Sequence, residues 1–164
     1  QFTIGRGTHV EERFSLNVGA VRYMERFGLD VSVDEATLTE ALDEIAADLA
    51  RLDDWLAVER VVGMGGGVTN LTAVKHGLAV YDRDVVHGTV LDRAEIDRQI
   101  ELYRTRDADQ RREIVGLQAN RAPVILAGAC IVRSILAKLG RESLTVSDRG
   151  LRHGLLVERF PHPT

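Results

Sequence analysis

Apolar and polar residues alternate along the first eighteen positions of the chain. Phe2 and Ile4 precede a turn at residues 5–7, and the alternation resumes over residues 10–18. Because successive side chains of a strand face opposite sides, this pattern predicts a β-hairpin. Residues 20–27 then predict a short helix that is ended by a glycine.

Apolar residues recur every three or four positions in much of the remaining chain, which is the period of a helix. Ser32 and Glu35 have the spacing of a capping box before one such stretch, and Asp92 and Glu95 repeat it before another. The helix over 122–139 is apolar nearly all round, so it is expected to be buried. The expected helices cover residues 20–27, 38–52, 69–76, 96–102, 108–115, 122–139 and 151–160.

Two short apolar runs, residues 58–62 and 144–146, have the composition of central strands. Each is followed by a glycine-rich or polar loop and then by a helix. A hairpin followed by alternating helices and strands predicts an α/β fold, in which helices cover both faces of a mixed sheet. Pro161 and Pro163 are expected to end the last helix.

Size and charge restrict the possible functions. The chain has 164 residues, of which 45% are hydrophobic and 28% charged, enough for the core of one globular domain. Its net charge of −4 argues against a surface devoted to nucleic acid or anionic lipid, so a polyanion would need a local basic patch. The single cysteine, Cys130, excludes an internal disulfide or a CxxC site, and the sequence has no pattern of a membrane span or signal peptide. A cytoplasmic protein is expected.

The strongest chemical signal is the glycine loop at residues 63–67, between an expected strand and the helix that begins at Thr69. Glycines let backbone N–H groups approach a phosphate, and a helix N-terminus favours negative charge. The loop has neither the Lys-Ser/Thr pair of a Walker motif nor the glycine spacing of a dinucleotide fingerprint. It is therefore either an anion site or a tight turn that packs a helix on the sheet.

A second signal lies at residues 146–154, where a strand ends and where α/β folds place ligand groups. Asp148 is either a helix cap or a carboxylate that orients a ligand, and Arg152 either neutralises phosphate or forms a salt bridge. His153 is expected to be a surface or packing residue. Arginines also crowd residues 104–121, where they form either a solvated helix face or a channel for polyphosphate.

Four segments of the chain, taken in order, resemble the motifs of one family. They are residues 15–22 (SLNVGAVR), 63–69 (GMGGGVT), 121–129 (RAPVILAGA) and 146–154 (VSDRGLRHG). Together they extend along the whole chain and resemble the Ppx/GppA phosphatases. Two positions depart from the family pattern, because Val68 separates a third glycine from Thr69 and His153 stands where glutamate is usual.

The resemblance implies an α/β lobe of the actin-like ATPase (ribonuclease H-like) fold. It implies that residues 1–164 form the second, C-terminal lobe of a two-lobe phosphatase whose N-terminal lobe is absent from this sequence. No catalytic residue and no magnesium ligand is expected here, since the family's general base lies in the other lobe. The phosphate-binding groups that the resemblance implies are Gly65, Gly66, Gly67 and Thr69, with Arg22 and Arg152 as electrostatic helpers.

The implied activity is that of an exopolyphosphatase, which uses Mg²⁺ to hydrolyse the terminal phosphate of inorganic polyphosphate between two lobes. Guanosine pentaphosphate is the alternative substrate. An actin-like ATPase or kinase lobe and a non-catalytic regulatory or dimerisation lobe are the other hypotheses. The resemblance also implies a homodimer in a short, two-lobe form without nucleic-acid or membrane partners. The isolated chain is expected to be inactive.

Overall fold

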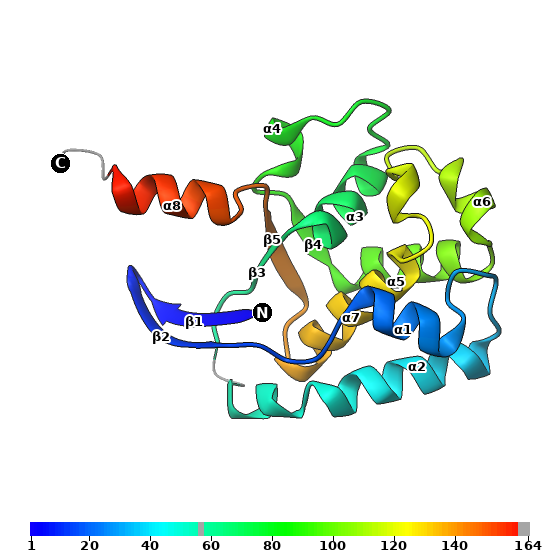
Figure 1. The fold of residues 1–164 in the computed structure, drawn as a ribbon, viewed down its shortest axis with the longest axis horizontal. Helices are drawn as coiled ribbons and strands as arrows, with labels where there is room; N and C mark the ends of the chain where they lie inside the picture. The colour runs from blue at the N-terminus through cyan, green and yellow to red at the C-terminus, as the bar shows by residue number, and fades with distance from the viewer. Residues whose placement is uncertain (56–57, 161–164) are drawn as a thin grey trace.

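A small mixed sheet lies between a helical bundle and the C-terminal helix (Figure 1). The computed structural model describes residues 1–55 and 58–160. Strand β5 (Ser143–Ser147) is central, pairing in parallel with β3 (Val62–Met64) and antiparallel with β4 (Val90–Asp92). The mixed α/β lobe expected from the sequence is confirmed, although β4 was not foreseen.

The N-terminal hairpin forms a sheet of its own. Strands β1 (Phe2–Arg6) and β2 (His9–Phe14) pair antiparallel, with the rings of Phe2 and Phe14 stacked 5.2 Å apart. Arg51 joins the hairpin to the helices, because its guanidinium lies 4.2 Å from the centre of the Phe14 ring and pairs with Glu12. The predicted hairpin is confirmed, and it lies apart from the three-stranded sheet.

Most of the core lies around α7, whose apolar residues Leu126, Ala127, Ala129 and Cys130 are fully buried. Helices α1, α2, α3 and α5 pack against it, so the prediction of a buried helix here is confirmed. The helical segments are α1 (Ala20–Phe27), α2 (Glu35–Asp48), η1 (Ala50–Trp55), α3 (Gly66–His76), α4 (Arg83–Val86), α5 (Arg93–Arg104), α6 (Ala108–Arg112), η2 (Ala119–Arg121), α7 (Ile125–Lys138) and α8 (Leu151–Arg159).

The two faces of the sheet are covered unequally. Leu144 and Val146 of β5 are buried on the face where α3 packs. On the opposite face Val62, Met64 and Val90 are about half exposed or more. Helix α8 leaves β5 on the side away from the bundle, so helices lie on both sides of the sheet (Figure 1).

Several expected boundaries were wrong. The cap of α2 is Asp34, not Ser32: its carboxylate accepts the Thr37 N–H at 2.9 Å, two residues further along than the predicted capping box. The strand predicted over 58–62 is β3, which begins at Val62, and the helix expected from Thr69 starts three residues earlier. Glycines therefore belong to the strand and to the first turn of the helix. The prolines expected to end α8 lie outside the described residues.

Arg111 of α6 is fully buried and bonds to the backbone of two other segments. Its guanidinium donates to the carbonyl oxygens of Tyr103 (2.9 Å), Leu29 (2.6 Å) and Val31 (3.1 Å). Burial lowers the pKa of Arg111 to about 10, so the side chain stays charged at neutral pH. The end of α5 and the turn after α1 thus share one buried cation.

Replacing Arg111 with Met should lower the free energy of unfolding by about 3 kcal/mol or more. Methionine fills the space but donates no hydrogen bond, and each buried carbonyl left without a partner costs about 1–3 kcal/mol. The neighbouring Arg112, which is exposed and pairs with Asp109, is the matched control. Arg112→Met should change the same urea-denaturation value by less than about 0.5 kcal/mol. Equal effects of the two changes would show that Arg111 does not hold these segments.

Candidate functional site

A cavity of about 270 Å³ opens where β3 and β5 end. Because these two strands are parallel, their carboxyl ends lie at the same edge of the sheet, and the loops that follow them meet there. The two segments singled out from the sequence are therefore brought together. The cavity is lined by Gly65, Gly66, Thr69, Ser147, Asp148, Gly150, Arg152 and His153.

The glycine loop presents the start of α3 to this cavity. Gly65 is the cap residue and has φ 97° and ψ 171°, a backbone conformation that is essentially restricted to glycine. The first intrahelical bond of α3 runs from the Thr69 N–H to the Gly65 carbonyl at 3.1 Å. The N–H groups of Gly66, Gly67 and Val68 precede that bond and have no acceptor within the helix. The start of α3 can thus donate hydrogen bonds to an anion.

Asn70 fixes the position of this helix start, and sequence reasoning missed it. Its side chain is 2% exposed, donates to the Gly66 carbonyl at 2.8 Å and accepts the Gln118 N–H at 2.9 Å. The glycine loop is thereby joined to η2, which carries Arg121. A Cβ placed on Gly66 would lie 2.8 Å from the Arg121 guanidinium, so this guanidinium lies close to the start of α3. The available signal was an amide side chain in the middle of a helical stretch, residues 68–74, that has no charged residue.

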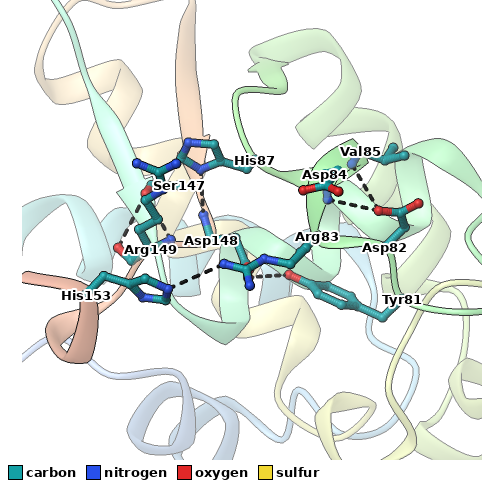
Figure 2. Close-up of polar contacts among 10 residues, drawn as sticks. All are labelled: Tyr81, Asp82, Arg83, Asp84, Val85, His87, Ser147, Asp148, Arg149 and His153. Atoms are coloured by element: carbon teal, nitrogen blue, oxygen red, sulfur yellow. Dashed lines mark hydrogen bonds and ion pairs between the residues drawn. The ribbon is translucent and has the colours of Figure 1, made fainter. Parts of the chain in front are cut away.

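The other wall of the cavity includes a network that the sequence did not indicate (Figure 2). Asp148 accepts a hydrogen bond from the Tyr81 hydroxyl at 2.5 Å and lies 3.7 Å from the Arg83 guanidinium. The Asp148 N–H donates to Nδ1 of His87 at 3.3 Å. Burial and the bond to Asp148 raise the pKa of Tyr81 to about 12, so this phenol remains a neutral donor at physiological pH.

Of the arginines singled out from the sequence, one lines the cavity and others pair with acidic residues elsewhere. Arg152 lines the cavity, as does His153, which is half-buried. Arg22 is not among the lining residues; it lies in α1, donates to the Asn17 carbonyl and pairs with Asp48 at 3.0 Å. Its role as a phosphate ligand stays a prediction. Of the arginines crowded into 104–121, Arg104 and Arg112 pair with acidic residues of their own helices, as a solvated face requires.

The charges around the cavity suit an anion better than a cation. Arg83, Arg121 and Arg152 lie in or beside it, and Asp148 is the carboxylate among its lining residues. Within residues 1–55 and 58–160, no group of three His, Cys, Asp or Glu side chains is placed to hold a metal ion without other ligands. A larger, shallow hollow of about 720 Å³ along α2 is lined by acidic residues and suits phosphate poorly. In the same part of the chain, each helix is too short or too polar to span a bilayer.

Comparison with known proteins places this geometry in a family. The family model described as "Ppx/GppA phosphatase family" matches residues 1–162. A crystal structure of the Ppx/GppA phosphatase of Aquifex aeolicus, in its type II variant, superposes with a TM-score of 0.90 at 30% sequence identity. That match covers 96% of this chain and 52% of the Aquifex chain.

Two curated relatives carry functional names. Exopolyphosphatase 2 of Mycobacterium tuberculosis is 27% identical over 92% of this chain and 50% of its own length. The bifunctional 3-dehydroquinate synthase/phosphatase of Fusobacterium nucleatum is 30% identical over 96% of this chain and 24% of its own length. The chain therefore spans half or less of the length of the curated relatives that it matches.

Gly65 and Gly67 should respond differently to replacement by alanine, because only Gly65 has a backbone conformation that strains other residues. Gly65→Ala should lower the free energy of unfolding by about 2 kcal/mol, because alanine is strained at this φ and ψ even though a Cβ there would meet no atom. Gly67 lies in the first turn of α3 and also has open space around it. Gly67→Ala should leave the stability unchanged or raise it by up to about 1 kcal/mol. Urea denaturation of both variants measures the difference, and equal losses would contradict the strained conformation of Gly65.

Proposed function

Since the chain belongs to the Ppx/GppA phosphatase family, we propose that it forms one wall of the catalytic cleft of an exopolyphosphatase. Its role is to bind the terminal phosphates of inorganic polyphosphate while the bond to the last phosphoryl group is hydrolysed. The relative named exopolyphosphatase supports this choice of substrate. The proposal concerns a protein of two lobes, of which this chain is the second.

The observation that carries the proposal is the convergence of donors on one cavity. Gly66 at the start of α3 and Arg152 both line it, and the Arg121 guanidinium lies beside Gly66. Gly67, the next residue of the helix, is not among the lining residues. Phosphoryl transfer depends mostly on positioning and on neutralising the charge spread over the phosphoryl oxygens. A wall that offers fixed N–H groups and guanidinium groups is suited to both tasks.

The proposal assigns this wall to binding and not to proton transfer. Asp148 is the carboxylate among the lining residues, and Tyr81 and Arg83 already engage it. A general base must reach the proton of the attacking water, so the proposal assigns that base to the other lobe. The proposal likewise assigns the magnesium ligands to the other lobe.

Guanosine pentaphosphate remains the second substrate to compare, because it also presents linked phosphates that end in a terminal phosphoryl group. An anion site built from backbone N–H groups and arginines recognises the phosphates that the two substrates share. Discrimination between them would come from groups that contact the guanosine. Direct comparison of the two substrates therefore belongs in the same experiment.

The test is phosphate release by the full-length, two-lobe protein with magnesium. Long-chain polyphosphate, guanosine pentaphosphate and ATP are compared at equal concentrations of terminal phosphate. We expect kcat/KM for polyphosphate to exceed that for ATP by about tenfold or more, since each further charge-assisted phosphate contact contributes about 1.5–3 kcal/mol. Chelation of the metal and use of residues 1–164 alone should each abolish release.

Three outcomes would contradict the proposal. Release from ATP alone would indicate an ATPase lobe, and release from none of the substrates would indicate a regulatory lobe. Magnesium-dependent release by residues 1–164 alone would show that the catalytic groups are not divided between two lobes.

A further inference from the structure

Arg83 lies beside the cavity although it belongs to a different part of the chain from the lining residues. It is the first residue of α4, in the segment that connects α3 to β4. Its guanidinium lies 3.4 Å from Nε2 of His153 and 3.7 Å from Oδ2 of Asp148, and both partners line the cavity (Figure 2). The side chain is 59% exposed. A charged group on an irregular segment therefore adjoins the anion site.

The contacts of Arg83 leave most of its donors available. Among the described residues, its nearest hydrogen-bond partner is His153 at 3.4 Å, and the contact with Asp148 is longer than a hydrogen bond. Arg22, by comparison, has a 3.0 Å bond to Asp48 and a second bond to a backbone carbonyl. A guanidinium carries five N–H donors, so Arg83 can donate hydrogen bonds to a phosphate without first breaking a strong bond.

The segment that carries Arg83 is held in place. The Gly88 N–H donates to the Val146 carbonyl at 2.8 Å, and the Val146 N–H donates to the Thr89 carbonyl at 2.8 Å. Asp82 caps α4 by accepting the Asp84 N–H at 2.9 Å. Tyr81 adds the short bond to Asp148. Arg83 is thus presented from a docked segment, which reduces the entropy that binding would cost.

Stability does not account for the Arg83–Asp148 pair. An exposed ion pair with this separation contributes about 0–1 kcal/mol. Asp148 already has two hydrogen bonds, from the Tyr81 hydroxyl and to Nδ1 of His87 through its own N–H. A role in ligand binding explains better why a weakly held arginine lies at the mouth of an anion site.

We propose that Arg83 is a specificity-determining residue of this cavity, which binds a phosphate of the substrate other than the one at the start of α3. Asp148 is its positioning residue, because its carboxylate, 3.7 Å away, attracts the guanidinium toward the cavity before the ligand arrives. This proposal rests on the proposed phosphate-binding function. It predicts that Arg83 favours ligands with several linked phosphates over ligands with one.

The test compares tripolyphosphate with orthophosphate as calorimetric probes of the full-length protein, in EDTA so that neither is turned over. Arg83→Ala should weaken tripolyphosphate binding about tenfold, the value of one bidentate, charge-assisted contact. Arg83→Lys should weaken tripolyphosphate binding about threefold, because lysine keeps the positive charge but cannot donate two parallel hydrogen bonds from one planar group. Orthophosphate affinity should change less than about twofold in both variants. The exposed Arg112 provides the control, and Arg112→Ala should leave both affinities unchanged.

A double-mutant comparison tests the positioning role. In an Asp148→Asn background, Arg83→Ala should weaken tripolyphosphate binding less than about threefold, because the negative charge that attracts Arg83 toward the cavity is gone. An undiminished tenfold loss there would remove Asp148 from the proposal. A loss in Arg83→Ala that is absent, or equal for the two anions, would overturn the role of Arg83 alone. If the unaltered protein binds neither anion, the proposed phosphate-binding function fails with it.

Discussion

Asn70 is buried behind the start of α3, and both ends of its amide are bonded to backbone groups. One bond holds the Gly66 carbonyl, and the other holds the Gln118 N–H, which is 48 residues away in the sequence. A buried amide without partners would cost free energy, so the two segments stay together as long as the helix is folded. The two bonds hold the backbone at the start of η2, the element that carries Arg121, next to the glycine loop. The geometry of the candidate anion site depends on them.

Stability and binding are located in different parts of the lobe. The core forms around α7, and Arg111 joins the neighbouring turns through buried carbonyl groups. The cavity lies at the far edge of the sheet, where the strands end and polar loops meet. Because the cavity is lined by loop residues and helix ends, exposed arginines can be maintained there at little cost to folding. The helices packed around α7 position the loops, and the loops carry the groups proposed to bind phosphate.

The sequence revealed the parts of the site that are local and left out those that depend on distant contacts. The glycine loop and residues 146–154 were predicted because a strand, a turn and a helix follow one another within each. Tyr81 and Arg83 were missed, since their partner Asp148 is 67 residues from Tyr81 and their segment has no periodic pattern. The start of α3 was placed too late because three glycines disfavour a helix, whereas Asn70 and the packing of α3 on α7 stabilise it. Arg22 carries no local sign of its bond to Asp48, which comes from tertiary packing of α1 on α2.

The central claim is that the start of α3 binds phosphate, and nuclear magnetic resonance tests it most directly. Pyrophosphate is titrated into the ¹⁵N-labelled protein, and the amide and arginine side-chain resonances are followed. We expect the largest shifts at Gly66, Gly67 and Val68 and at the side chain of Arg121, with little change along the β1–β2 hairpin. Shifts that are largest around Arg22 and Asp48, or that are spread evenly over the surface, would contradict the claim.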